Sequence, residues 1–254
     1  MKILITGGNG YIAKSLYNVL KDKYDITLIT RHNFDLTSFK DMNDFFQGKY
    51  FDIIIHCAVE GGSRLKIDSY KDMDANLIMY YNLLQHKAHY NKLLHFNSGA
   101  ETNAPDSPYG LSKRIISKSI SEIENFYNLK IFAVFDENEW DTRFIKSNIK
   151  RYINKESIII NQDKWMDFFY MKDLVSLIEF YILNNDLPKE IDCSYSNLYK
   201  LSDVANIINN LSEYKVYINI ENKEIAPSYC GKANTMLDFI GLENGIQEVY
   251  NKLK

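Results

Sequence analysis

Short runs of apolar residues alternate along the chain with longer segments in which apolar positions recur every three or four residues. The short runs predict buried strands, and the longer segments predict amphipathic helices. As far as about residue 136, strands and helices follow one another in turn. The predicted strands are Lys2–Thr6, Ile26–Thr30, Asp52–His56, Leu93–Asn97 and Ile131–Phe135, and the predicted helices are Tyr11–Asp22, Ser38–Phe46, Asp68–Lys87 and Pro108–Asn128.

Repeated strand–helix units require a parallel sheet with helices on both faces, because each crossover is long and right-handed. The sequence therefore predicts an α/β protein with a Rossmann-type doubly wound sheet, which binds ligands at the carboxyl ends of its strands. We expect the dinucleotide-binding domain to span residues 1–136 with parts of 137–185.

The pattern after about residue 136 is less regular and predicts a small mixed α/β lobe. We expect this lobe, about residues 137–254, to be interwoven with the first domain and to close over its strand ends. Its predicted helices are Asp141–Tyr152, Met171–Leu183, Leu201–Leu211 and Asn244–Leu253, and its predicted strands are Ser157–Ile160, Glu190–Cys193 and Lys215–Ile220.

Composition excludes several classes of protein. The 254 residues are 46% apolar and 25% charged, with a net charge of −3, which indicates neither a nucleic acid nor an acidic membrane as partner. Three cysteines without a Cys-x-x-Cys pair indicate neither a disulfide framework nor a zinc site, and the histidines lack metal-ligand spacing. With no apolar leader and no membrane-length apolar run, we expect a cytoplasmic protein without a metal.

A glycine-rich turn follows the first predicted strand and opens directly into a helix. Glycine permits a tight turn and a close approach to a pyrophosphate, whose charge then lies against amides at the helix N-terminus. Gly7 and Gly10 fit these roles, and Ala13 is small enough for the helix to pack on the sheet. This context predicts a dinucleotide site rather than an ordinary turn.

The end of the second predicted strand bears on the choice of cofactor. An acidic residue there binds the ribose hydroxyls of NAD, whereas a cation binds the 2′-phosphate of NADP. Here the strand is followed by Arg31, whose planar guanidinium suits a phosphate, and by no acid. We therefore expect NADP(H), with Asp35 and Leu36 bordering the adenine; the alternative is a solvated arginine in a turn.

A tyrosine and a lysine four residues apart, Tyr109 and Lys113, form the candidate catalytic pair. On a helix they share a face, and a neighbouring ammonium favours the phenolate, which prepares the tyrosine for proton transfer. The same spacing occurs in Tyr17/Lys21 and Tyr250/Lys254 without such a context. Only Tyr109 follows a strand that ends in a hydroxyl, Ser98, which can orient a substrate carbonyl.

Together these residues resemble the extended short-chain dehydrogenase/reductase family, also called the NAD-dependent epimerase/dehydratase family, whose members act on nucleotide-linked sugars. The resemblance covers nearly the whole chain. It implies cofactor contacts from the glycine-rich loop, from the end of the Asp52–His56 strand, and from the Asp68–Lys87 helix. These implied residues, beside Gly7, Gly10, Tyr109 and Lys113, are Asn9, Tyr11, Ile12, Cys57, Ala58, Val59 and Asn76.

Within this family the chain looks most like the GDP-fucose synthase group, whose members use NADPH to epimerise and then reduce a 4-keto sugar. The segments that supply the epimerase acid and base read Gly99-Ala100-Glu101 and Asp136-Glu137-Asn138 here, without the cysteine or the histidine. The dehydratases' Asp-Glu pair is also missing after Ser98, and Met166 stands where arginine is usual. We therefore expect reduction of a keto group without epimerisation.

Three functions remain open at this point. The preferred one is NADPH-dependent reduction of a nucleotide-activated keto-sugar, at C4, in surface-polysaccharide synthesis. The second is reversible C4 epimerisation with tightly bound NAD, and the third is a non-catalytic dinucleotide sensor.

The predicted substrate contacts are less specific than the catalytic residues. A loop after the Asp52–His56 strand follows the cofactor contacts, and an arginine further along can bind a diphosphate with both arms of its guanidinium. We interpret Trp165 as a plug of the lobe rather than a base contact, and we expect a homodimer formed by the Asp68–Lys87 and Pro108–Asn128 helices. The predicted substrate residues are Glu60, Gly61, Gly62, Ser63, Arg64, Ser98, Asn138 and Arg143.

Overall fold

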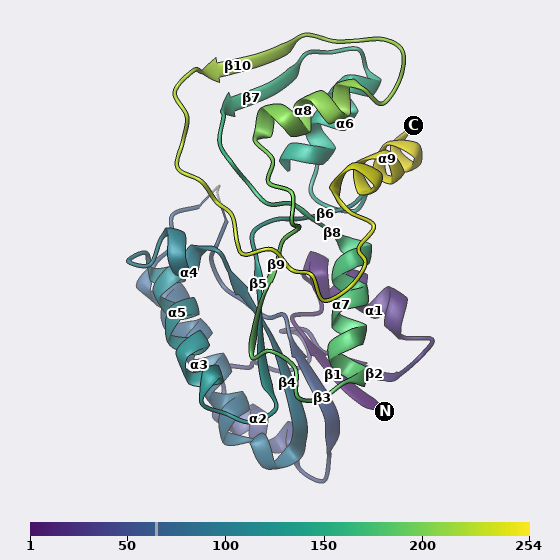
Figure 1. The fold of residues 1–254 in the computed structure, drawn as a ribbon. Coiled ribbons are helices and arrows are strands. Elements are labelled where there is room, and N and C mark those ends of the chain that lie inside the picture. The colour runs from purple at the N-terminus through teal and green to yellow at the C-terminus, as the bar shows by residue number, and fades with distance from the viewer. Residues whose placement is uncertain (64–65) are drawn as a thin grey trace. The chain divides into compact units, whose positions relative to one another are not determined.

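The computed structural model describes residues 1–63 and 66–254, which form two compact units (Figure 1). Unit 1 comprises Met1–Lys130 and Ile178–Ile191, and unit 2 comprises Ile131–Leu177 and Asp192–Lys254. The division after Lys130 lies close to the expected one at residue 136, and the helix and strand around residues 178–191 return the chain to unit 1.

Unit 1 is built on a six-stranded sheet in the order β2-β1-β3-β4-β5-β9. The pairs β1–β2, β1–β3 and β3–β4 are parallel, and Thr6 at the end of β1 lies opposite His56 at the end of β3. The strand order reverses direction at β1, so the crevice between the ends of β1 and β3 is the expected ligand position. The strands are β1 (Lys2–Thr6), β2 (Asp25–Leu28), β3 (Phe51–His56), β4 (Tyr90–Ser98), β5 (Phe126–Ile131) and β9 (Glu190–Cys193).

Helices cover both faces of this sheet (Figure 1). On one face α2, α3 and α5 pack against the strands in a core that includes Met42, Met79, Ile116 and Leu93, all at most 4% exposed. Helix α1 lies on the other face, and its buried side chains are Ala13, Leu16 and Leu20. The bounds are α1 (Tyr11–Leu20), α2 (Phe39–Phe46), α3 (Tyr70–Gln85), the 3₁₀ turn Lys87–His89, α4 (Ala100–Asn103) and α5 (Pro108–Ser121).

Serine side chains fix where the helices of this face begin. Ser38, Ser69 and Ser107 each accept a hydrogen bond from a backbone N–H in the first turn, and Asp72 completes a capping box with Ser69. Such caps stabilise a helix by about 1 kcal/mol each. The cap at Ser107 sets Pro108 and Tyr109 as the first residues of α5.

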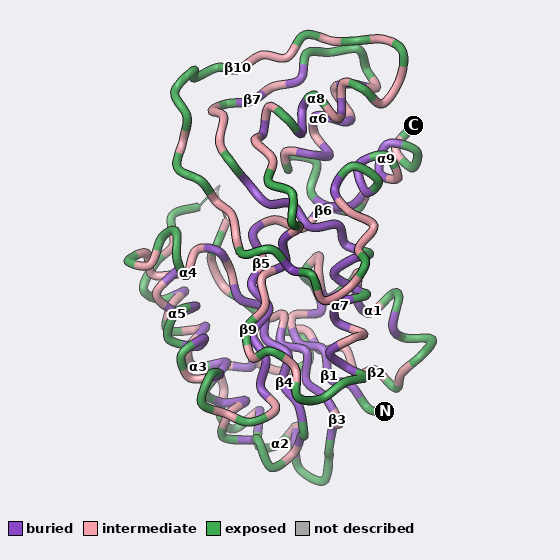
Figure 2. The backbone as a smooth tube through the Cα atoms, viewed as in Figure 1, coloured by how far each residue is buried: buried purple, intermediate pink, exposed green. Residues whose placement is uncertain are grey.

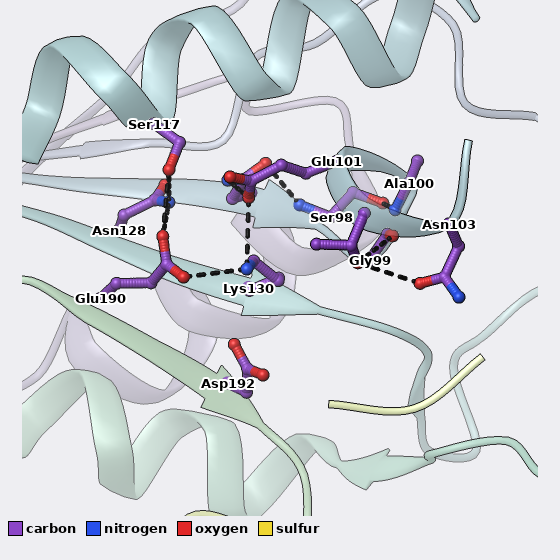
Figure 3. A network of polar contacts seen from close by, with 12 residues as sticks. Ser98, Gly99, Ala100, Glu101, Asn103, Ser117, Asn128, Lys130, Glu190 and Asp192 are labelled. Atoms are coloured by element: carbon purple, nitrogen blue, oxygen red, sulfur yellow. Dashed lines mark hydrogen bonds and ion pairs between the residues drawn. The ribbon is translucent and has the colours of Figure 1, made fainter. Parts of the chain in front are cut away.

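The sequence prediction was wrong over residues 122–135. The helix predicted to reach Asn128 ends at Ser121, and β5 starts at Phe126, after Asn125 has turned the backbone with a φ of 59°. The predicted strand Ile131–Phe135 is replaced by the end of β5 and by the two-residue strand β6 (Val134–Phe135). The apolar pattern of a buried strand is interrupted in β5 by the buried polar residues Asn128 and Lys130. These bind Glu190 on the neighbouring strand (Figure 3).

Unit 2 contains two small sheets, β7–β10 and β6–β8, with a core formed by helices α6, α8 and α9. Helix α7 contributes Asp173, which accepts hydrogen bonds from the N–H groups of Ile240 and Gly241 before α9. The strands are β6 (Val134–Phe135), β7 (Ile158–Gln162), β8 (Phe169–Tyr170) and β10 (Ile218–Asn222), and the helices are α6 (Phe144–Ile153), α7 (Met171–Leu183), α8 (Leu201–Asn209) and α9 (Leu242–Leu253).

The predicted α/β class with a Rossmann-type doubly wound sheet is confirmed. Figure 2 shows β1, β3, β4 and β5 buried over most of their length, as expected for a sheet covered on both faces. Among the described residues, no helix combines the length and the apolar character needed to cross a membrane.

Candidate active site

The glycine-rich loop lies against the end of β3. Gly7 has a φ of 71°, and a Cβ atom added to it would lie 2.7 Å from the backbone N and Cα of Ala58. Only glycine therefore fits this position without strain. Gly10 caps α1 and has no side chain to cover the amides of the first turn, which suits a bound phosphate.

The remaining predicted loop residues lie at the start of α1. Asn9 is exposed, Tyr11 and Ile12 are half-buried, and Ala13 is fully buried in the packing of the helix on the sheet.

Thr6 joins the ends of β1 and β3, a role that the sequence analysis missed. Its hydroxyl oxygen lies 2.8 Å from His56 Nδ1 and accepts hydrogen bonds from the N–H groups of Cys57 and Ala58 at 3.1 Å. Burial raises the pKa of the Cys57 thiol, which therefore stays protonated, and Val59 beyond it is exposed. These bonds hold the predicted cofactor segment against the glycine-rich loop.

Asn76 on α3 fixes the next residue of this segment. Its Oδ1 accepts from the Glu60 N–H at 2.8 Å, and its Nδ2 donates to the Glu60 carbonyl at 2.9 Å. The Glu60 carboxylate forms an ion pair with Arg31, the predicted phosphate ligand. The predicted phosphate contact and one predicted sugar contact are thus joined in an ion pair.

The two glycines that follow bring the backbone over Tyr109. Gly61 and Gly62 have φ values of 79° and 70°, and a Cβ on Gly62 would lie 2.7 Å from the Cζ atom of Tyr109. The Gly62 N–H donates to Asp68 Oδ1 at 2.8 Å, which holds the turn. Ser63 follows, and Arg64 lies outside the described residues.

The adenine contacts predicted for Asp35 and Leu36 lie in the loop after β2. The Asp35 carboxylate accepts hydrogen bonds from Thr37, which lower its pKa. The Leu36 side chain is buried in the core, and its carbonyl accepts from Asn82 at 2.8 Å.

Lys113 lies in a buried position behind Tyr109. Its side chain is on the same helix face, with Nζ 5.7 Å from the centre of the Tyr109 ring, and Nζ donates to the Phe96 carbonyl at 2.6 Å. The residue is only 3% exposed, and burial lowers its pKa to about 8. Gly110 permits the close approach of α4 to the first turn of α5, because a Cβ there would lie 2.0 Å from the Ala104 carbonyl oxygen.

The other pairs with this spacing have the same contact but a different environment. Lys21 lies 5.9 Å from the Tyr17 ring and Lys254 lies 5.8 Å from the Tyr250 ring, yet both lysines are exposed. Burial of the ammonium, rather than its distance from a ring, therefore distinguishes the Tyr109 pair.

Ser98 is the last residue of β4, two residues beyond the carbonyl that binds Lys113. Its Oγ accepts from the Ala100 N–H at 3.2 Å, and its own N–H donates to Asn97 Oδ1 at 2.8 Å. Lys113 thus links the first two turns of α5, which carry Tyr109, to the end of β4, which carries Ser98. A phenol beside a buried ammonium, with a hydroxyl on the adjacent strand, can donate a proton to a carbonyl oxygen.

The remaining predicted contacts belong to unit 2. The Asn138 N–H donates to Asp136 Oδ1 at 2.7 Å, and Arg143 precedes α6 with its guanidinium 5.7 Å from the Trp140 ring. Trp165 lies under the Lys200 ammonium, and Met166 is buried in the core of this unit. Across residues 1–63 and 66–254 there is no cluster of three His, Cys, Asp or Glu side chains that could hold a metal ion.

A reversal of strand order at β1, with a glycine-rich loop at the reversal, defines a Rossmann-type dinucleotide-binding protein. Residues 3–193 match the model of the NAD dependent epimerase/dehydratase family, and the chain belongs to this family. The resemblance inferred from the motifs is confirmed.

Individual relatives agree with this assignment. The chain is 25% identical to GDP-L-colitose synthase of Yersinia pseudotuberculosis, over 97% of this chain and 94% of that protein. Its fold is similar to that of GDP-mannoheptose C4 reductase from Campylobacter jejuni with NADP bound (TM-score 0.80, 16% identity, 99% and 98% of the chains). It is also similar to UDP-glucose 4-epimerase from Thermotoga maritima with UDP-glucose (TM-score 0.79, 15% identity, 100% and 98%).

Proposed function

We propose that the protein reduces the keto group at C4 of a nucleotide-activated sugar with NADPH, without epimerising it, in surface-polysaccharide synthesis. The observation that carries this proposal is the buried Lys113 ammonium behind Tyr109, at the strand end that bears Ser98. The relatives named as a GDP-colitose synthase and a GDP-mannoheptose C4 reductase support a keto-sugar substrate.

The residues of unit 1 fit a dinucleotide. At the ends of β1 and β3, the expected ligand position, only glycine fits at residue 7, and Gly10 leaves the first turn of α1 open to a pyrophosphate. Bound NADPH supplies the hydride for the keto carbon. Ser98 orients the carbonyl, Tyr109 gives its proton to the carbonyl oxygen, and Lys113 stabilises the phenolate that remains and holds the ribose.

Epimerisation at the carbons beside the keto group needs an acid and a base in addition to Tyr109. The segment after Ser98 offers only Glu101, whose carboxylate is ion-paired with Lys130. Burial raises the pKa of the Cys57 thiol, so this group does not supply the base near neutral pH. Both observations support reduction alone.

The alternative, reversible C4 epimerisation, is kept open by the structural likeness to UDP-glucose 4-epimerase. The two functions differ in the fate of the cofactor. Purified protein will be incubated with NADPH and a panel of 4-keto nucleotide sugars while absorbance at 340 nm is followed. One NADPH consumed per hydroxyl formed supports the reductase, whereas interconversion of 4-hydroxy sugars without net NADPH consumption supports the epimerase. Tight NADPH binding with neither reaction supports a dinucleotide sensor.

The choice of NADP over NAD depends on Arg31, and replacing it with alanine is expected to weaken NADPH binding about 10- to 100-fold. This range corresponds to about 1.5–3 kcal/mol for hydrogen bonds to a charged group. The affinity for NADH, which lacks the 2′-phosphate, should change less than twofold. Isothermal titration calorimetry with the two cofactors measures both values, and equal losses for both would contradict the assignment.

Glu60→Gln provides the matched control, because it removes the partner that competes for Arg31. The exposed ion pair contributes at most about 1 kcal/mol, so NADPH affinity should rise by up to about fivefold.

We also propose a homodimer through α3 and α5, which pack against each other. Their outer surface carries the exposed apolar side chains Ile78, Tyr81 and Ile115, which a second copy would cover.

A further inference from the structure

We propose that Glu101 is a positioning residue for the reduction: its carboxylate orients Ser98 through Asn97 and holds Lys113 in its cationic form. This inference rests on the proposed function, since it concerns the same catalytic residues. Glu101 is not part of the motifs that indicate the catalytic residues. It lies in the short helix α4, which the sequence pattern did not predict.

Glu101 is a buried carboxylate with defined partners (Figure 3). Its Oε2 accepts a hydrogen bond from Asn97 Nδ2 and lies 3.3 Å from the Lys130 ammonium. The side chains of Glu101 and Lys130 are only 13% and 7% exposed. A charge in such a position is retained only with good partners, because its desolvation is costly.

The link to Ser98 runs through the side-chain amide of Asn97, which is 3% exposed. Glu101 can only accept from this amide, so the NH₂ group must face Glu101 and Oδ1 must face the other way. Oδ1 then accepts from the Ser98 N–H at 2.8 Å. Glu101 thereby sets the orientation of the amide that holds the backbone of Ser98.

The link to Lys113 is electrostatic, and the two groups bind adjacent residues of β4. Lys113 Nζ donates to the Phe96 carbonyl, and Glu101 accepts from the Asn97 side chain. Burial lowers the pKa of Lys113 to about 8, and interactions with Cys57 and with the Glu101 carboxylate raise it. Other titratable groups near Lys113 are His56 and His95 on β3 and β4, and Cys57. Burial lowers the pKa of His56 to about 3, lowers that of His95, and raises that of Cys57, so all three are uncharged near neutral pH. Of the two groups that raise the pKa of Lys113, Cys57 is a neutral thiol, so the ion-paired carboxylate of Glu101 is the one that favours the ammonium.

A second carboxylate on the same lysine provides a matched control. Glu190 Oε1 lies 2.9 Å from the Lys130 ammonium, and Glu190 Oε2 accepts from Ser117 at 3.0 Å and from Asn128 at 3.3 Å (Figure 3). Its hydrogen bonds differ from those of Glu101, which include Asn97. Replacing either acid with glutamine removes one counter-charge from Lys130, but only Glu101→Gln exchanges the carboxylate that binds Asn97 for a neutral amide, which is a weaker acceptor.

The test compares the pH dependence of kcat and KM in Glu101→Gln and Glu190→Gln. Because Lys113 acts in its protonated form, a lower pKa of Lys113 makes activity fall at a lower pH. Glu101→Gln is expected to reduce kcat about tenfold with KM changed less than threefold, and to move the alkaline limb down by about half to one pH unit. Glu190→Gln should keep kcat within about twofold and should not move the alkaline limb of the pH profile. Both variants are expected to lose thermal stability.

A readout without turnover separates this inference from the proposed function. Proteins labelled with ¹³C-lysine are titrated by NMR, and the Lys113 signal is assigned with Lys113→Met. A lower Lys113 pKa in Glu101→Gln but not in Glu190→Gln supports the electrostatic role even if no keto-sugar is reduced. Equal Lys113 titrations in the three proteins, or equal losses of kcat in both variants, would show that Glu101 only neutralises Lys130 and would overturn the proposal.

Discussion

Replacing Tyr109 with phenylalanine is expected to lower turnover of the keto-sugar by about two to four orders of magnitude, the range for loss of a general acid. NADPH affinity should remain within about threefold, because the ring that lies under Gly62 and beside Lys113 is kept. Stopped-flow reduction assays and fluorescence titration with NADPH measure the two quantities separately.

Tyr17→Phe is the control for this substitution. Tyr17 is also followed four residues later by a lysine, Lys21, whose Nζ lies at nearly the same distance from the tyrosine ring as Nζ of Lys113 does. Lys21, however, is exposed. This variant should turn over at the wild-type rate. Wild-type turnover by Tyr109→Phe itself would refute the proton donor, and with it the proposed reduction.

The second large effect is expected from Lys113→Met, which should lose activity without losing thermal stability. Turnover should fall at least about 100-fold, because the phenolate of Tyr109 loses its cation. Thermal stability should stay the same or increase, since methionine fills a similar volume and the desolvated ammonium disappears. Differential scanning fluorimetry and NADPH oxidation assays are performed on the same preparation.

Lys118→Met, on the same helix, is the matched control, because its side chain is 81% exposed. Neither its turnover nor its melting temperature should change appreciably. A large loss of stability in Lys113→Met would instead assign Lys113 a structural role through its bond to Phe96.

The sequence predicted the architecture where local patterns and long-range packing agree. Strand Lys2–Thr6, the glycine-rich turn and α1 follow from periodicity and from the conformations that glycine allows. The prediction failed at β5, because Asn128 and Lys130 look like solvent-facing residues until Glu190, distant in sequence, is placed beside them. Partners far apart along the chain are not visible in a local pattern.

The candidate site was predictable to a similar degree. Helical spacing correctly placed Lys113 on the same face as Tyr109, but it could not reveal that Lys113 is buried whereas Lys21 is exposed. The bonds of Thr6 to the β3 end and of Asn76 to Glu60 depend on the sheet order, so spacing carries no signal for them. A serine or threonine ending the first strand is the one local clue that could have indicated Thr6.

The raised pKa values of the thiols have a consequence for handling the protein. The pKa of Cys57 and of Cys193 is raised, and that of Cys230 is raised to about 11, so at neutral pH these sulfurs carry almost no thiolate. Peroxide and alkylating reagents attack the thiolate form, and such cysteines react slowly. An enzyme built in this way should keep working under mild oxidation without an added reductant.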